Sequence, residues 1–425
     1  MIFALSDCNN FYASVERVFN PKLEGKPVVV LSNNDGVIIA RSNEAKALGI
    51  KMATPIFKVQ HIIDKHRVHV FSSNYVLYGD MSHRVISVLR ESAPEIEIYS
   101  IDEAFLKLDG IQENFTNFGR NLRDKVKKWT GIPISVGIAD TKTLTKVANE
   151  LAKKDPKYNG VLDISGLKDA KIDPYLERLD ISDVWGIGRR LSPMLRVHGI
   201  RTARDLKYAS DQWIRKCINV LGLKTVHELR GISCIQLEEN PAPKKSIAST
   251  RSFGRPVQSL TELKQAVAMY VTTATEKLRE GRQVASAIQV FIHTNYHRQD
   301  QAQYANSTAT MLPQPTSHSP TIVRFAHKLL EQIYKPGYKY KKAGIILTKL
   351  MPKDQIQLDL FKSHKSNTHN ERIMQTLDKI NAKHGRNTLS LAALGLRKPW
   401  KMRQLQKSKR FTTKWNETIR VNVDR

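Results

Sequence analysis

Short apolar runs alternate with helical patterns along residues 1–165. Compact runs rich in β-branched residues are typical of strands, and they predict strands at 2–7, 27–32, 36–41, 95–102 and 133–140. Apolar residues spaced three or four apart predict helices at 43–49, 75–91 and 141–154. This interleaving predicts an α/β or α+β fold for the first part of the chain.

The sequence NNDG at 33–36 separates two of the predicted strands. Asn and Gly readily adopt the positive φ angles that a tight turn requires. We therefore expect a hairpin here, with the Asn and Gly residues supplying those angles.

The remainder of the chain shows two further patterns. Residues 166–235 read as short helical segments, and NPAPKK at 240–245 predicts a linker, because closely spaced prolines interrupt both helices and strand ladders. Beyond the linker, strands and helices alternate, with strands at 285–294 and 342–350 and helices near 259–280 and 319–334. This order indicates a β-α-β-β-α-β-like domain.

The length of 425 residues, of which 41% are hydrophobic, predicts about two to four domains with packed cores. The formal net charge is +28. Lys and Arg exceed Asp and Glu by 3 in residues 1–165, 3 in 166–242, 11 in 243–350 and 12 in 362–425. A polyanion such as nucleic acid is therefore the expected partner. The more acidic front half suits metal chemistry, and the basic back half suits phosphate binding.

Three irregularly spaced cysteines, Cys8, Cys217 and Cys234, form neither a disulfide framework nor a CxxC metal pair. No apolar run approaches the roughly 18 residues of a membrane span, and no secretion signal is recognisable. We expect a cytoplasmic protein with reduced thiols and no membrane partner.

Three carboxylates, Asp7, Asp102 and Glu103, lie at the ends of predicted apolar strands. If those strand ends are neighbours, their oxygens converge, and the backbone carbonyl of Cys8 adds a further ligand. Oxygen ligands without a nearby His suit Mg²⁺, and two such ions activate an attacking oxygen and stabilise a leaving phosphate. Consecutive strand residues point to opposite faces, so Asp102 and Glu103 share a site only where the strand bends or ends. Taken alone, such acids are more often a solvated sheet edge.

Two aromatic residues, Phe11 and Tyr12, follow the first acid at the expected start of a helix. Both could be core residues. A ring beside the sugar of a bound nucleotide would clash with a 2′-hydroxyl, so Tyr12 is also a candidate for selecting deoxyribose.

Basic side chains that could meet a triphosphate are Arg41 and Lys46 after the hairpin, and Lys153 and Lys154 at a helix end. Their alternative is a solvated helix face. At 183–191, DVWGIGRRL has the form of a helix-hairpin-helix, whose glycines let backbone N–H groups approach a DNA phosphate; its alternative is an ordinary tight turn.

Together, these stretches form an ordered set. It comprises SDCNNFYASVE, VVVLSNNDGVIIARSNEAKALGIKM, FSSNYVLYGDMS, EIYSIDEAF, VGIADTKTLTKVANELAKK, DVWGIGRRL and RSFG. The chain resembles Y-family DNA polymerases along essentially its whole length, and most closely the UmuC-like catalytic subunits of bacterial DNA polymerase V.

The resemblance implies an α+β right-hand polymerase. Its parts would be a palm at 1–19 and 75–165, fingers at 20–74, a helical thumb with the helix-hairpin-helix at 166–239, a linker at 240–245, a little finger at 246–350 and a C-terminal tail at 351–425. The implied activity is error-prone, template-directed DNA synthesis past damaged bases in the bacterial SOS response, in the cytoplasm and at the nucleoid.

The resemblance also implies roles for individual residues. Metal would be bound by Asp7, Asp102, Glu103 and the Cys8 carbonyl, with two Mg²⁺ ions per site. The nucleotide would be bound by Phe11, Tyr12 as the steric gate, Lys46 and Lys153. DNA would be bound by Gly186, Gly188, Arg189, Arg190 and Arg251. Many family members carry Tyr in place of Asn43 and Arg in place of Lys46.

The tail adds a candidate partner motif, QIQLDLF. A glutamine followed by spaced leucines and an aromatic resembles a sliding-clamp-binding peptide, with Gln357, Leu358, Leu360 and Phe361 as its contacts. Its alternative is a last element of the preceding domain. Further along, Trp400 and Trp415 are possible partner contacts, and the resemblance implies a processed UmuD-type dimer and a RecA-type recombinase filament as partners.

Two other classes of protein remain open at this point. A different two-metal enzyme on a palm-like core, such as a nucleotidyl cyclase, would explain the acids but not the glycine hairpin or the basic C-terminal half. A catalytically silent DNA-binding scaffold would explain the charge but leave the three acids without a role. Primer dependence and the effect of Asp102→Asn discriminate between these classes.

Overall fold

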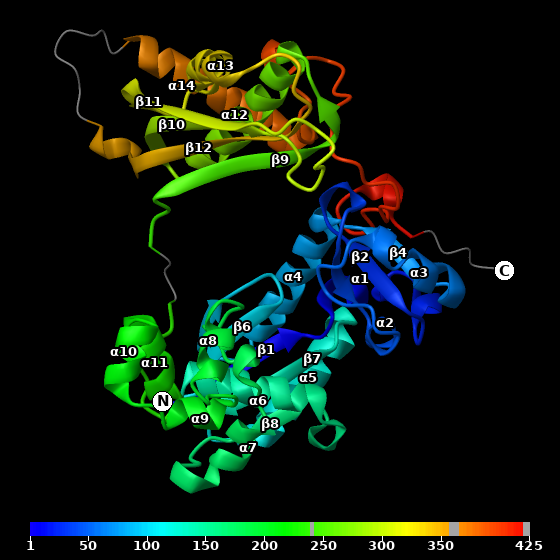
Figure 1. Cartoon of the computed structure of the whole chain (residues 1–425), viewed down its shortest axis with the longest axis vertical. Coiled ribbons are helices and arrows are strands. Elements are labelled where there is room, and N and C mark those ends of the chain that lie inside the picture. Colours follow the sequence, from blue (N-terminus) through cyan, green and yellow to red (C-terminus); the bar gives the residue numbers. More distant parts are fainter. Residues whose placement is uncertain (239–241, 357–364, 420–425) are drawn as a thin grey trace. The chain divides into compact units, whose positions relative to one another are not determined.

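The computed structural model describes residues 1–238, 242–356 and 365–419. The chain divides into two compact units, coloured along the sequence in Figure 1. Unit 1 comprises Met1–Ser32, Gly36–Pro241 and Leu405–Arg425, and unit 2 comprises Asn33–Asp35 and Ala242–Gln404.

The central sheet of unit 1 has the strand order β5-β6-β1-β7-β8. Its strands are β1 (Phe3–Cys8), β5 (Glu95–Ile98), β6 (Glu103–Lys107), β7 (Ile134–Ala139) and β8 (Val161–Asp163). The helices that share hydrophobic cores with it are α1 (Phe11–Val18), α4 (Tyr75–Arg90), α5 (Phe115–Thr130) and α6 (Lys142–Lys154). Strand β1 is antiparallel to both β6 and β7, so the N-terminal strand lies in the middle of the sheet.

A second sheet in unit 1 has the order β3-β2-β4. Its strands are β2 (Val28–Leu31), β3 (Ile38–Arg41) and β4 (His69–Ser72), accompanied by helices α2 (Asn43–Ala47) and α3 (Gln60–His66). The predicted hairpin joins β2 and β3, which pair antiparallel. The expectation for its glycine was wrong: Asn34 and Asp35 have positive φ angles of 62° and 50°, whereas Gly36 has a φ of −84°. The connection is a 3₁₀ turn at Asn33–Asp35, in which the Asn-Asp pair supplies the left-handed conformation.

The short-segmented helical region of unit 1 follows the first sheet. It consists of α7 (Asp173–Glu177), α8 (Leu191–Val197), α9 (Ala203–Lys207), α10 (Asp211–Cys217) and α11 (Val220–Leu229). The glycine hairpin precedes α8, and Gly186 there has a φ of 87°, a conformation that L side chains rarely adopt.

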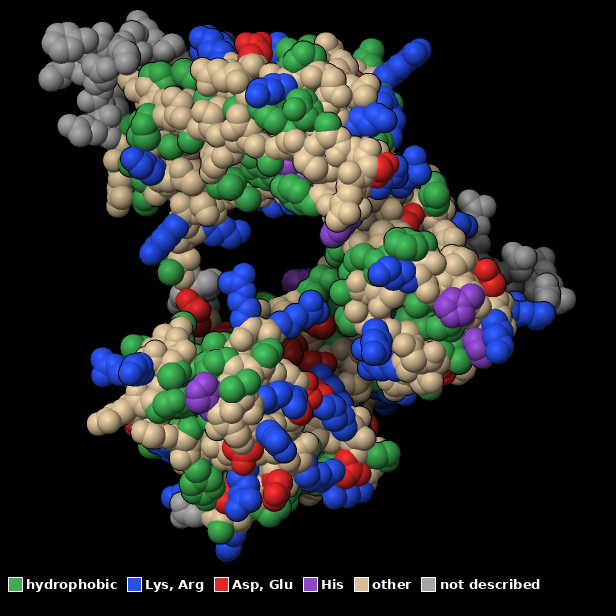
Figure 2. All heavy atoms as spheres, viewed as in Figure 1, with side chains coloured by type: hydrophobic (Ala, Val, Ile, Leu, Met, Phe, Trp, Pro, Cys, Tyr) green, Lys and Arg blue, Asp and Glu red, His purple; other side chains and the backbone are tan. Residues whose placement is uncertain are grey.

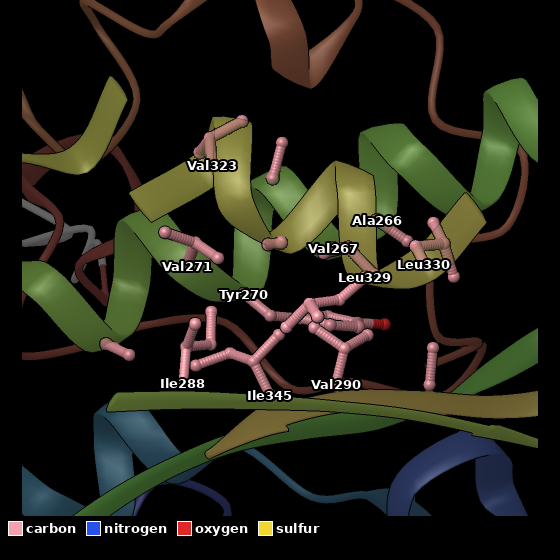
Figure 3. Packing of buried hydrophobic residues seen from close by; sticks show 14 of the residues in the cluster. Ala266, Val267, Tyr270, Val271, Ile288, Val290, Val323, Leu329, Leu330 and Ile345 are labelled. Atoms are coloured by element: carbon pink, nitrogen blue, oxygen red, sulfur yellow. The ribbon is translucent and has the colours of Figure 1, made fainter. Parts of the chain in front are cut away.

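Unit 2 confirms the β-α-β-β-α-β order predicted for it. Its elements are β9 (Ser246–Val257), α12 (Leu260–Glu280), β10 (Gln283–His293), β11 (Ala305–Thr316), α13 (Ser319–Ile333) and β12 (Tyr340–Pro352). The sheet order is β11-β10-β12-β9, with antiparallel neighbours. Figure 3 shows the side chains of both helices packed against one face of the sheet, where Tyr270 of α12 meets Val290 of β10 and Ile345 of β12.

Part of the C-terminal tail belongs to unit 2. Helix α14 (Lys365–His384) is tied to α12 by an ion pair in which Arg279 Nε and Nη2 lie 2.6 and 2.8 Å from the two carboxylate oxygens of Asp378. The expectation that Trp400 contacts a partner was wrong, because only 2% of it is exposed and its ring packs in the core with Phe253 and Tyr270. Trp415, in contrast, is almost fully exposed.

The three cysteines are free, as expected. Figure 2 shows Lys and Arg side chains spread over the surface of both units, with acidic side chains among them. None of the helices in the described ranges combines the length and apolar character that a membrane crossing requires.

Candidate active site

Two of the predicted acids meet across the central sheet of unit 1. Asp7 of β1 lies directly opposite Glu103, the first residue of β6, in the antiparallel register. Opposed residues in such a register place their side chains on the same face of the sheet, with Cβ atoms about 5 Å apart. The register therefore joins two carboxylates that lie far apart in the sequence.

Helix α6 covers this face of the sheet at close range. A Cβ on Gly137 of β7 would lie 2.2 Å from the backbone nitrogen of Asn149, so only glycine permits this approach. The Asn149 side chain donates hydrogen bonds to the carbonyls of Leu5 (3.1 Å) and Ser135 (2.9 Å). These contacts fix the helix on the sheet beside Asp7.

Two lysines of α6 then reach the two acids. Lys146 and Lys153 are two helical turns apart and so lie on one side of the helix. Lys146 Nζ is 3.0 Å from Glu103 Oε2, and Lys153 Nζ is 2.5 Å from Asp7 Oδ2. Each carboxylate thus has its own cation from the same helix.

The third acid, Asp102, lies in a bend between β5 and β6. Its backbone carbonyl accepts a hydrogen bond of 2.8 Å from the Cys8 N–H, and its Oδ1 accepts one of 2.5 Å from Ser100 Oγ. The single strand expected over 95–102 was therefore wrong in its second half. Because consecutive residues of a strand point to opposite faces, Asp102 and Glu103 can serve one site only with such a bend between the strands.

The electrostatics of the paired acids differ. Burial raises the pKa of Asp7 to about 7, with Glu103 adding to the rise, although Lys153 opposes it. Burial acts in the same sense on Glu103, but Lys146, Asp7 as a hydrogen-bond partner and Lys153 together hold the pKa of Glu103 below its usual value. Two carboxylates in contact in a buried site repel each other, so nearby positive charge stabilises their ionised forms.

The donor set fits a hard divalent cation. Asp7, Asp102 and Glu103 offer carboxylate oxygens, and oxygen-only ligands are what Mg²⁺ prefers. In the described part of the chain, no group of three or more His, Cys, Asp or Glu side chains is already gathered as a metal site. Lys153 and Lys146 instead supply positive charge to Asp7 and Glu103.

Of the two aromatic residues that follow Asp7, Phe11 lies in the core and Tyr12 lies near the acids. Phe11 is 3% exposed and belongs to the hydrophobic core, whereas Tyr12 is partly exposed. The Tyr12 ring stacks on Tyr78 with centroids 4.5 Å apart and meets Tyr75 edge-on at 6.0 Å. Burial raises the pKa of Tyr12 to about 12, and the charge of Asp102 contributes, so the ring lies within electrostatic reach of the acids.

Basic residues gather beside the acids. Burial lowers the pKa of Lys46, and the neighbouring charges of Arg41 and Lys153 lower it further. Asn43 Oδ1 accepts hydrogen bonds from Asn10 Nδ2 (3.0 Å) and from Lys46 Nζ (3.4 Å). Arg41 and Lys153 thus both repel the Lys46 ammonium, and a nearby anion would relieve this repulsion.

Comparison with known proteins identifies the family. Residues 6–150 match the impB/mucB/samB family, residues 244–360 match the C-terminal domain of that family, and residues 371–421 match a domain of unknown function. The UmuC protein of Salmonella typhimurium is 44% identical over 423 residues, covering 99% of this chain and 100% of that one. The chain belongs to the impB/mucB/samB family.

Three further proteins are similar to the chain to different degrees. MucB of Escherichia coli is 42% identical, covering 97% of this chain and 98% of that protein. DNA polymerase IV of Bacillus velezensis is 27% identical, covering 91% of this chain and 92% of that protein. A solved Y-family DNA polymerase chimera of Dbh and Dpo4 shares the fold, with a TM-score of 0.66 and 22% identity, and is matched over 83% of this chain and 100% of its own.

This UmuC-like chain is a Y-family DNA polymerase of the error-prone, translesion type that acts in SOS mutagenesis. Its mixed helices and sheets have the palm, fingers, thumb and little-finger architecture of that family.

The other predicted contacts of the polymerase are on different elements of the chain. Arg189 and Arg190, beside Gly186 and Gly188, are exposed before α8, and Arg251 is exposed on β9. Lys154 turns away from Asp7, because it pairs with Asp183 (2.8 Å) and Glu150 (3.1 Å). The clamp motif at Gln357, Leu358, Leu360 and Phe361 lies outside the described residues.

Sequence reasoning missed two further residues near the acids, Lys146 and Tyr78. The spacing of Lys146 from Lys153, two turns along a predicted helix, was a usable signal for the first. Tyr78 is in the predicted helix 75–91, but no local pattern reveals its stacking on Tyr12.

Proposed function

We propose that this polymerase adds deoxynucleotides to a primer 3′-end at the site formed by Asp7, Asp102 and Glu103. These side chains and the Cys8 carbonyl would hold two Mg²⁺ ions, which supply charge neutralisation for the attacking 3′-oxygen and for the departing pyrophosphate. The observation that carries the proposal is the antiparallel register that sets Asp7 opposite Glu103, with a lysine of α6 on each.

The protein side chains have separate tasks in this proposal. Asp7 would be a metal ligand, and Lys153, which now pairs with Asp7, would then be able to bind the triphosphate together with Lys46 and Arg41. Support comes from the pKa of Lys46, which burial lowers and which the charges of Arg41 and Lys153 lower further, because a bound polyanion would relieve that repulsion. Lys146 stays with Glu103 and orients that carboxylate.

Tyr12 serves as the sugar gate in this proposal. Its ring is partly exposed close to the acids and rests on a second ring, so it cannot retreat from a 2′-hydroxyl without unstacking. Phe11 acts from the core beneath it. The DNA is bound by Gly186, Gly188, Arg189, Arg190 and Arg251 through phosphate contacts, which fix position without reading sequence.

Partners complete the proposed function. The sliding clamp binds residues 357–361, and a processed UmuD-type dimer and a RecA-type filament bind the polymerase at the nucleoid. Deleting 357–361 is expected to abolish clamp-stimulated synthesis and to leave distributive synthesis intact. Clamp stimulation that survives the deletion overturns the motif assignment.

Primer extension tests the catalytic proposal. Undamaged and abasic templates are copied with Mg²⁺ by the wild type and by Asp102→Asn, alone and with a UmuD-type dimer and recombinase filament. Loss of one metal ligand is expected to lower the rate by about 10³-fold or more. Asp124→Asn, at an exposed residue of α5, is the matched control and retains the wild-type rate.

Extension that persists in Asp102→Asn contradicts the assigned acid. If the wild type binds DNA but extends no primer with any combination of partners, a silent scaffold replaces the polymerase. Dependence on a primer excludes a nucleotidyl cyclase.

A further inference from the structure

Residues 405–419, the part of the tail in unit 1, lie against the second sheet of that unit. Lys407 forms a parallel bridge with Ser72 at the end of β4. The Ser72 N–H donates to the Gln406 carbonyl at 3.0 Å, and the Gln406 N–H donates to Ser72 Oγ at 3.0 Å. The tail thus pairs with β4, an edge strand of the sheet, whose unpaired backbone groups offer such a template.

The next tail residue is held by the start of α4. Asn74 precedes this helix and is fully buried, yet its side chain caps no helical N–H. Its Nδ2 instead donates to the Ser408 carbonyl (3.1 Å), to Ser408 Oγ (3.0 Å) and to the Lys409 carbonyl (3.2 Å). A residue type that normally caps a helix is here committed to the tail.

A hydrogen-bonded chain then leads from the tail to the gate. Ser408 Oγ accepts from Asn74 and donates its proton to Glu16 Oε1 at 2.9 Å. The same Glu16 oxygen accepts a hydrogen bond of 2.6 Å from the Tyr78 hydroxyl. The Tyr78 ring stacks on Tyr12 with an interplanar angle of 15°.

Glu16 is the central member of this chain. It is a carboxylate only 2% exposed, and it is held by two hydroxyl donors, one from α4 and one from the tail. Both hydroxyls donate to the same oxygen of this buried carboxylate, and a buried carboxylate that loses a hydrogen bond is costly. The side chain of Glu16 therefore keeps a position that satisfies both donors, so the position of one donor constrains that of the other. Fixing the Tyr78 hydroxyl fixes the ring against which Tyr12 stacks.

We propose that residues 405–419 position the sugar gate, with Ser408, Glu16 and Tyr78 acting through one another on Tyr12. The inference rests on the proposed role of Tyr12 and gives a role to the end of the segment that matches a domain of unknown function. The three are positioning residues, and their effect is on the choice between deoxyribose and ribose.

The test is single-nucleotide primer extension by the full-length polymerase, measuring kcat/KM for a deoxynucleotide and for its ribonucleotide. Ser408→Ala and Tyr78→Phe each remove one hydroxyl. Each is expected to lower discrimination against the ribonucleotide by about 3- to 10-fold, while kcat/KM for the deoxynucleotide changes by less than about twofold. The double variant is expected to lose no more than the larger single effect, because both act through Glu16.

Two variants serve as matched controls. Ser408→Thr keeps the hydroxyl and is expected to keep discrimination. Thr413→Ala alters an exposed tail residue away from Glu16 and is expected to have no effect.

Tyr12→Ala separates the two hypotheses. If it leaves discrimination unchanged, the gate itself is overturned and this inference falls with it. If Tyr12→Ala admits ribonucleotides while Ser408→Ala and Tyr78→Phe discriminate like the wild type, the gate stands and the positioning role of the tail is overturned. Loss in Ser408→Ala that Ser408→Thr does not show supports the proposal.

Discussion

The tail segments 365–404 and 405–419 fall largely within one matched family segment, yet they are held by different interactions. The first inserts Trp400 into the core of unit 2, and its Lys401 carbonyl approaches so closely that a Cβ on Gly254 would lie 2.2 Å from it. The second is held in unit 1 by hydrogen bonds to Ser72, Asn74 and Glu16 and by the ring of Phe411, which stacks on Phe19.

The two parts of the tail are attached to the molecule by different kinds of interaction. Burial of a large aromatic side chain contributes several kcal/mol, whereas a hydrogen bond exchanged for one to water contributes about 1 kcal/mol net. Residues 365–404 are therefore a structural part of unit 2. None of the residues 405–419 is fully buried, and they are the residues proposed to position the sugar gate.

The largest effect is expected from Trp400→Ala. Removing a buried Trp leaves a cavity and costs about 3–5 kcal/mol of the unfolding free energy of unit 2. Trp400→Phe is the matched control: it keeps most of the ring packing and removes an Nε1 that has no hydrogen-bond partner within the described residues. Urea unfolding, with hydrogen exchange to localise the change, makes the measurement. Equal stability of the Ala variant and the wild type would show that the aromatic anchor is unimportant.

A smaller effect is expected from Asp378→Asn, which breaks the bidentate contact of α14 with Arg279. The partly buried pair is worth about 1 kcal/mol, and hydrogen exchange in α14 should quicken accordingly. Glu371→Gln, on the same helix, removes an ion pair with Lys353 whose members are both more than 40% exposed, and it should change nothing. Identical exchange in both variants would contradict a stabilising role for Asp378.

The most local effect on stability is expected from Phe411→Ala. The Phe411 ring stacks on Phe19 at 4.8 Å, a pair worth about 1 kcal/mol beyond the area that it buries, so unit 1 should stay folded while residues 405–419 exchange faster. Trp415→Ala, at a residue 94% exposed, is the matched control without effect. Slower exchange of 405–419 than of 365–404 in the wild type would reverse the comparison between the two segments.

The sequence by itself determined the features that depend on local pattern. Period-two and period-three-to-four spacing predicted β1, β7, α4 and α6 beside the site and the order of unit 2, but not β6, which carries Glu103. The positions of Asp7, Asp102 and Glu103 beside apolar runs were also readable. So was the condition that Asp102 and Glu103 share a site only where the strand bends or ends, because strand alternation is a local rule.

Only the tertiary structure decided which distant groups meet. Strand register placed Asp7 opposite Glu103, and the Gly137 contact brought Lys146 and Lys153 over them. No periodicity in the tail distinguishes Trp400, which is buried, from Trp415, which is exposed. The link from Ser408 through Glu16 to Tyr78 depends likewise on contacts between residues far apart in sequence, and the energy of such contacts is set by packing rather than by the pattern of neighbouring residues.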